Sequence, residues 1–99
     1  MNYTVRYTAA ARKDLARLLA CVADRDLSSA LKARAAITEA VRLLELFPYS
    51  CRSAGNVDPF LRELLVPFGH AGFVKLYRIE DDNVIRILAA RHQREEDYY

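Results

Sequence analysis

Long apolar runs and closely spaced cysteines are both missing from this 99-residue chain, and we expect no signal peptide. No apolar run approaches the ~20 residues that a membrane-spanning helix needs, so we expect no membrane association. Met1 opens directly into a strand-like segment, so we expect a cytoplasmic protein. The two cysteines, Cys21 and Cys51, lack the spacing of metal ligands, and in a reducing compartment we expect free thiols.

A strong excess of charge of one sign is missing as well. The chain carries 15 basic and 13 acidic side chains, a net charge of +2. Residues 1–59 hold 9 basic and 6 acidic side chains, and residues 60–99 hold 6 and 7. A domain that grips a nucleic-acid backbone usually has a larger basic excess, so composition does not support direct nucleic-acid binding. With two histidines and no ligand spacing, we expect no metal and no cofactor.

What is present is the composition of a globular domain, with 53% hydrophobic and 28% charged residues. No repeat, linker or low-complexity segment divides the chain. We therefore expect a single domain over residues 1–99.

The N-terminal half predicts one strand and two helices. Asn2–Tyr7 alternates apolar and polar side chains as a short strand does. Thr8 stands at the N-cap of a first helix, and Asp26 or Ser28 stands at that of a second, which Pro48 ends. The many alanines favour close packing of the two helices as an antiparallel hairpin. The apolar stripes consist of Leu15, Leu18, Leu19 and Val22 in the first helix and Ala30, Ala33, Ile37, Ala40, Val41, Leu44 and Phe47 in the second.

The C-terminal half predicts three strands, of which the last two form a β-hairpin. Phe60–Val66 reads as a strand, and the β-rich runs Phe73–Ile79 and Val84–Arg91 flank the turn Glu80–Asn83. We expect an even loop, pairing Ile79 with Val84 and Leu76 with Ile87, because an odd loop would place Arg86 on an apolar inner face. The predicted inner face consists of Val74, Leu76, Ile85, Ile87 and Ala89, and the outer face of Phe73, Lys75, Tyr77, Val84, Arg86, Leu88 and His92.

This order predicts the α+β class: an N-terminal strand, an α-helical hairpin and a three-stranded antiparallel meander, with the helices on one face of a single sheet. Four stretches of the chain, in this order, resemble the RelE/ParE family of toxins from bacterial type II toxin–antitoxin systems. They are Leu46–Pro48, Leu61–Leu64, Phe73–Tyr77 and Ala90–His92, followed by the acidic and aromatic C-terminal run.

The resemblance favours the ParE branch, which implies a non-enzymatic inhibitor of DNA gyrase that a cognate ParD-like antitoxin silences. It implies contact with operator DNA only through the antitoxin, and either a homodimer or a hetero-oligomer with the antitoxin. The first alternative is a RelE-like ribosome-dependent mRNA endonuclease. In that branch cleavage depends on two arginines, and the matching positions here hold Val74 and Gln93. If the chain is an RNase, His92, Tyr99 and Arg62 are the candidate catalytic residues. The second alternative is an inactive member that acts as an interaction module or corepressor.

The end of the chain supplies the candidates for binding the target. They are Arg91, His92, Arg94, Tyr98 and Tyr99, which follow the last strand at the end of the sheet. A structural role for the two arginines, as ion-pair partners of the acidic tail, is equally compatible with the sequence. The charges of Arg62, Lys75, Arg78 and Arg86 form either a basic face or solvated strand positions.

The predicted outer face supplies candidates for binding the antitoxin. Phe73, Tyr77, Val84 and Leu88 make it too apolar to be left uncovered on so small a chain. A groove between the sheet and the alanine-rich helices, near Ala33, could also accept an amphipathic segment.

Overall fold

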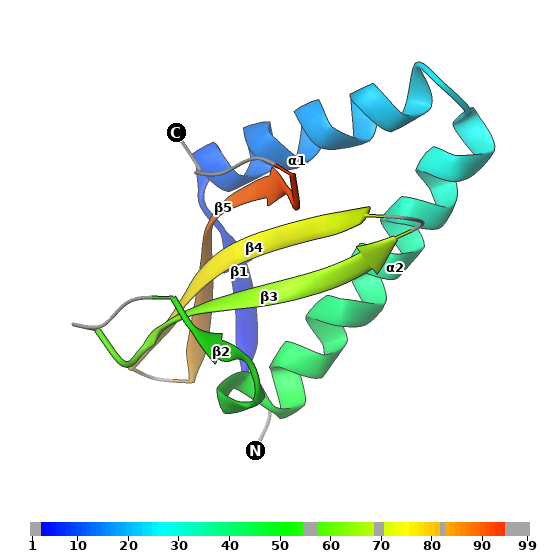
Figure 1. The fold of residues 1–99 in the computed structure, drawn as a ribbon. Helices are drawn as coiled ribbons and strands as arrows, with labels where there is room; N and C mark the ends of the chain where they lie inside the picture. Colours follow the sequence, from blue (N-terminus) through cyan, green and yellow to red (C-terminus); the bar gives the residue numbers. More distant parts are fainter. Residues whose placement is uncertain (1–2, 55–57, 69–70, 82, 95–99) are drawn as a thin grey trace.

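Two long helices pack on the same side of a five-stranded sheet (Figure 1). The computed structural model describes residues 3–54, 58–68, 71–81 and 83–94. The elements in chain order are β1 (Thr4–Tyr7), α1 (Ala9–Ala23), α2 (Leu27–Leu46), the 3-10 turn η1 (Pro48–Ser50), β2 (Arg52–Ser53), β3 (Leu61–Phe68), β4 (Ala71–Glu80) and β5 (Val84–His92). The predicted α+β class and element order are confirmed, and the two-residue β2 is an addition.

The sheet order is β1-β5-β4-β3-β2. Strand β1 runs parallel to β5, and all other neighbouring strands are antiparallel. The first strand of the chain therefore lies beside the last, on the far side of the meander from β2. Strand β3 continues past Pro67, which pairs with Gly72 in register. The predicted end of this strand at Val66 is wrong, because β2 pairs only with Arg62 and Glu63 and leaves the proline on a free edge, where its missing amide is tolerated.

Side-chain caps begin both helices as predicted. The hydroxyl of Thr8 accepts a hydrogen bond from the Ala11 amide at 3.1 Å, and it donates to the Leu88 carbonyl at 3.1 Å. The carboxylate of Asp26 accepts from the Ser29 hydroxyl and the Ser28 amide, and these hydrogen bonds lower its pKa. Each cap satisfies amide groups that have no partner within the helix.

The core lies between the helices and one face of the sheet. It consists of Ala11 and Leu18 from α1, Ala33, Ile37 and Leu44 from α2, and Leu64, Val66, Phe73, Tyr77, Ile79, Ile85, Ile87 and Ala90 from the sheet. Phe47, expected on the apolar face of the second helix, is instead 60% exposed, because it is the residue at which the helix ends. The hydroxyl of Tyr77 donates to the Pro48 carbonyl at 2.6 Å and so ties β4 to the turn that follows α2.

The turn of the hairpin is odd, and the predicted even loop is wrong. Glu80 pairs with Val84 and Ile79 pairs with Ile85. Asn83 adopts a left-handed φ of 59°, a conformation that asparagine tolerates better than most residues. The difficulty foreseen for Arg86 does not arise, because its guanidinium faces away from the helices and forms an ion pair with Glu80 at 2.8 Å.

A β-bulge then shifts the register of β4 against β5. Tyr77 pairs with Ile87, but Leu76 pairs with Ala89, so Leu88 is the extra residue. Ile85 and Ile87 are buried as predicted, but the odd turn places them on the same face as Tyr77 and Ile79, so the predicted faces of β4 are reversed. The bulge reverses the predicted faces of β5 beyond Leu88. Phe73 and Tyr77, expected on the exposed side, face the helices and are 3% and 0% exposed.

Three of the five candidate antitoxin contacts are therefore not surface residues. Phe73, Tyr77 and Ala33 lie in the core, the last with 0% exposure. Val84 and Leu88 are half-buried. For Phe73 and Tyr77 the reason is the register, since a shift by one residue moves every side chain of a strand to the other face. Ala33 is buried because it lies on the face of α2 that packs in the core. None of the helices in the described ranges is long and apolar enough to cross a membrane.

Candidate functional site

Two surfaces concentrate polar chemistry: the sheet face that points away from the helices, which we call the open face, and a groove between the helices. On the open face, alternating residues of neighbouring strands lie in rows. One row joins Leu65, Val74 and Arg91, and another joins Glu63, Leu76 and Ala89. Leu65 is 43% exposed here, whereas its neighbour in the row, Val74, is only 1% exposed.

Ion pairs cross the open face. The guanidinium of Arg91 on β5 reaches over β4 to Glu63 on β3, at 3.9 Å, and Arg52 on β2 contacts the same carboxylate at 3.1 Å. The Arg91 and Glu63 side chains are 13% and 15% exposed, so water screens this pair little. Through Glu63, these two contacts link β2, β3 and β5 across the open face.

The other two pairs on this face are more exposed. Arg78 contacts Asp58 at 3.0 Å and Arg86 contacts Glu80 at 2.8 Å, with the arginine side chains 43% and 41% exposed. Hydrogen bonds from the Phe60 amide and from Arg78 lower the pKa of Asp58. The open face thus presents arginines that already have carboxylate partners.

The three predicted target-binding residues that the structure describes do not share one face of the sheet. Arg91 lies on the open face, and its guanidinium also donates to the carbonyls of His92 and Gln93 at 3.3 and 3.4 Å. His92 pairs with Phe73 in the core-facing row, and the edge of its ring meets that phenyl ring at a centroid distance of 6.3 Å. The Nδ1 atom of His92 accepts from the Arg94 amide at 3.1 Å. Tyr98 and Tyr99 lie outside the described residues.

The two candidate catalytic residues within the described ranges, Arg62 and His92, are also separated. Arg62 lies at the far end of β3, where it donates to the carbonyls of Cys51 at 2.6 Å and Tyr49 at 3.2 Å. Arg62 pairs with Tyr77 and His92 pairs with Phe73, so the two lie about 13 Å apart along the strand direction. They cannot act together on one phosphate in this conformation. Tyr99 lies outside the described residues.

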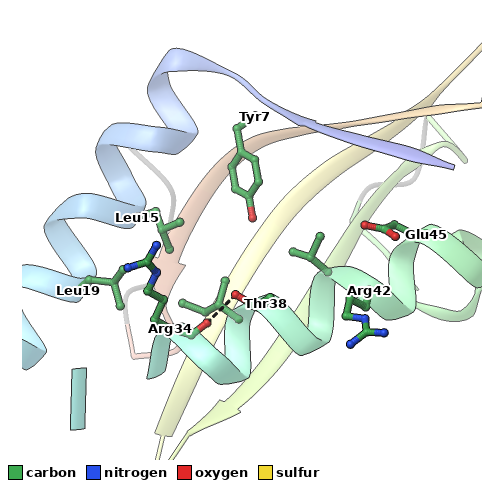
Figure 2. A pocket seen from close by; sticks show the side chains of 9 residues that line it. Tyr7, Leu15, Leu19, Arg34, Thr38, Arg42 and Glu45 are labelled. Carbon is green, nitrogen blue, oxygen red and sulfur yellow. Dashed lines mark hydrogen bonds between the residues drawn. The ribbon is translucent and has the colours of Figure 1, made fainter. Parts of the chain in front are cut away.

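The second surface is a groove of about 340 Å³ between α1, α2 and β1 (Figure 2). Leu15 and Leu19 of α1 and Ile37 and Val41 of α2 form apolar walls, and Tyr7 of β1 forms the floor. The rim carries Arg34, Thr38, Arg42 and Glu45, all on α2. The sequence predicted a groove between the sheet and the helical hairpin near Ala33, but Ala33 is not part of the lining of this groove.

Sequence reasoning missed the polar group beneath this groove. Lys75, expected on the exposed face, is 0% exposed and points between the sheet and the helices. Its Nζ atom lies 2.6 Å from the Tyr7 hydroxyl and 4.7 Å from the centre of that ring. Burial lowers the pKa of Lys75 to about 8 and raises the pKa of Tyr7. Elsewhere, the described residues contain no group of three or more potential metal ligands.

Comparison with known proteins gives the class of this chain. A family model described as the ParE toxin of the type II toxin–antitoxin system parDE matches residues 5–97. Toxin RelE1 of Caulobacter vibrioides is 31% identical over 84 residues, which is 85% of this chain and 87% of the relative. The chain therefore belongs to the ParE toxin family, within the RelE/ParE superfamily of type II toxin–antitoxin toxins.

Solved structures of toxin–antitoxin systems share the fold. The chromosomal ParDE system from P. aeruginosa matches with a TM-score of 0.68 and 24% identity, covering 95% of this chain and 97% of that one. The RelBE2 toxin–antitoxin complex from Mycobacterium tuberculosis matches with a TM-score of 0.57 and 26% identity, covering 93% and 99%. Both branches of the superfamily are thus represented among the relatives.

Proposed function

We propose that this chain is a ParE-like toxin that inhibits DNA gyrase and is silenced by a cognate ParD-like antitoxin. The observation that carries the proposal is the chemistry of the open face. Cleavage of mRNA needs a base and an acid at the reacting oxygens, and cations free to stabilise the developing negative charge. The position that resembles the strand arginine of the RelE branch is Val74, and the neighbouring arginines carry carboxylate partners.

The separation of the candidate catalytic residues supports the same reading. Arg62 holds the carbonyls of the turn after α2, whereas His92 packs on Phe73 at the other end of the sheet. An inhibitor that binds gyrase needs only a complementary protein surface. Arg94, which is exposed at the end of β5, is the target-binding candidate whose side chain is free of core packing.

The antitoxin partner is supported by the groove and by the solved relatives, which come from ParDE and RelBE2 toxin–antitoxin systems. Apolar walls with i, i+4 spacing suit the apolar face of an amphipathic helix. Binding to operator DNA would then be indirect, through the antitoxin.

The RelE-like endonuclease is the second candidate, because the curated relative bears the name Toxin RelE1. A side-by-side assay of the purified chain separates the two. We expect it to block gyrase supercoiling, or to trap gyrase on cleaved DNA, while mRNA on programmed ribosomes stays intact. Added antitoxin should reverse the block. Cleaved ribosomal mRNA with normal supercoiling would overturn the proposal.

A matched pair of variants refines this assay. Arg94→Ala removes an exposed arginine at the proposed contact, and Arg25→Ala removes an exposed arginine in the turn between the helices. We expect the first to weaken inhibition of gyrase and the second to leave it unchanged. Equal inhibition by both variants would remove Arg94 from the contact.

A further inference from the structure

We propose that the groove between the helices recognises an acidic side chain: a carboxylate of the antitoxin segment that accepts a hydrogen bond from the Tyr7 hydroxyl, with Lys75 behind that hydroxyl as the counter-charge. The inference rests on the proposed antitoxin partner and adds the chemistry by which the groove selects it.

Lys75 brings a positive charge into the core without a negative partner. An ammonium has three N–H donors, and the Tyr7 hydroxyl accepts one of them at 2.6 Å. No carboxylate among the described residues pairs with Lys75. Buried charges are normally paired, so a charge in this state is stabilised by any anion that approaches it.

Tyr7 lies between this buried charge and the groove. Its hydroxyl oxygen accepts from Lys75, so the hydroxyl hydrogen points elsewhere, and no acceptor for it lies among the described residues. Figure 2 shows the hydroxyl end of Tyr7 directed into the groove, towards Thr38. The Thr38 hydroxyl already donates to the Arg34 carbonyl at 2.9 Å, so it does not compete as a donor.

The rim favours the same sign of ligand. Arg34 and Arg42 stand exposed on α2, against the single carboxylate of Glu45. Arg42 and Glu39 lie 3.8 Å apart, but with side chains more than 70% exposed they interact weakly. The groove therefore combines apolar walls with a basic rim and a donor at its floor. An amphipathic helix with an Asp or Glu on its apolar face satisfies all three.

The test uses calorimetry with the antitoxin encoded beside the toxin gene. We expect Tyr7→Phe to weaken binding about 10- to 100-fold, the range of a lost hydrogen bond to a charged group. Tyr3→Phe is the matched control, because Tyr3 directly precedes β1 and packs against the core but does not line the groove. It should bind as the wild type does. Tyr7→Phe also leaves Lys75 without its hydrogen-bond acceptor. The affinity of the double variant Tyr7→Phe/Lys75→Met is therefore measured as well, and circular dichroism checks that both variants are folded.

A double-mutant cycle identifies the acid. Each Asp and Glu of the antitoxin is changed in turn to Asn or Gln. One change should weaken binding to the wild type about 10-fold or more, and it should have no further effect on Tyr7→Phe. If every Asn or Gln variant of the antitoxin loses as much affinity for Tyr7→Phe as for the wild-type toxin, no acid is coupled to Tyr7 and the inference is overturned.

A third variant separates this failure from failure of the antitoxin assignment. Val41→Glu places a charge on an apolar wall of the groove. If it abolishes binding while no acid couples to Tyr7, the antitoxin fills the groove but acid recognition is wrong. If binding is unchanged in folded Val41→Glu, the antitoxin does not occupy the groove at all. If instead the free chain is a dimer that Val41→Glu dissociates, the occupant is a second copy, and the inference fails.

Discussion

The ammonium of Lys75 and the hydroxyl of Tyr7 lie 2.6 Å apart although 68 positions separate the two residues in the chain. The contact spans β5, which lies between β1 and β4 in the sheet. This contact places the charged group of Lys75, on the central strand β4, beneath the groove whose floor is Tyr7 of β1. The same pair therefore couples the stability of the fold to the chemistry of the groove.

The first prediction concerns the stability cost of this buried charge. At pH 7 the lysine is charged in both the folded and the unfolded chain, and burial disfavours the charged form. Replacing it in Lys75→Met removes that penalty and keeps most of the volume. We expect the variant to be more stable than the wild type by up to about 3 kcal/mol, the equivalent of its pKa shift. Urea unfolding at pH 7 measures the difference, and a clear loss of stability would contradict this account.

The pH dependence of the same difference gives the second prediction. The folded pKa of about 8 lies below the unfolded value of 10.5. Between these values the unfolded chain holds a proton that the folded chain lacks, so the stability of the wild type rises with pH relative to Lys75→Met. The advantage of the variant should therefore shrink from pH 8 to pH 10. Above about pH 10 the buried tyrosines, whose pKa values are raised, act in the opposite direction. A constant advantage over this range would show that the charge is not buried.

Antitoxin affinity supplies the third prediction. A bound carboxylate would raise the pKa of Lys75, so binding needs the protonated lysine. Affinity should fall as pH rises from 7 to 9, by up to about 10-fold per unit above the free pKa. The other charges that face this region are Asp14 on α1, which accepts from the Ala90 amide, and Arg34, Arg42 and Glu45 on the rim. All of these groups are also present in Lys75→Met, which therefore serves as the control for them. Lys75→Met should show a flat profile, and a fall of equal size in that variant would contradict the assignment.

The fourth prediction separates shielded from exposed ion pairs on the open face. Arg91→Ala removes the shielded ion-pair partner of Glu63 and leaves the exposed Arg52 in contact with it, and we expect a loss of about 1–3 kcal/mol in the free energy of unfolding. Arg78→Ala removes an exposed pair and should cost less than about 1 kcal/mol. Thermal unfolding monitored by circular dichroism compares them. Equal costs would mean that the Arg91–Glu63 contact contributes no more than a surface pair.

This prediction also affects how toxicity is mapped. Arg91→Ala is expected to lower the stability of the fold as well as to remove any contact with a target, whereas Arg94→Ala tests the contact alone. Loss of toxicity in Arg91→Ala is therefore interpretable only beside its measured stability.

Local signals carried the part of the fold that sequence could predict. The caps at Thr8 and Asp26 and the helical break at Pro48 act through neighbouring residues, so the helices were located correctly. The faces of the hairpin were not, because they depend on the parity of one turn and on the extra residue Leu88. Both are properties of strand pairing that alternation alone does not determine.

The Lys75–Tyr7 pair could not be predicted from the sequence for a related reason. A lysine in an alternating strand is ordinarily solvated, and only the packing of two helices over β4 buries Lys75. Its partner Tyr7 lies 68 positions away in the sequence, so no local sequence motif predicts the pair. The predicted outer-face position was correct for Arg86, which lies on the open face beside Arg78.

The most direct test of gyrase inhibition follows DNA and mRNA in the same cells after expression of the chain. The account predicts arrested replication with gyrase covalently trapped on broken DNA, while transcripts stay full length, and it predicts that co-expressed antitoxin prevents both the arrest and the breaks. Transcripts cut at the codon in the ribosomal A site, with chromosomal DNA intact and normally supercoiled, would contradict it and establish the chain as an mRNA endonuclease.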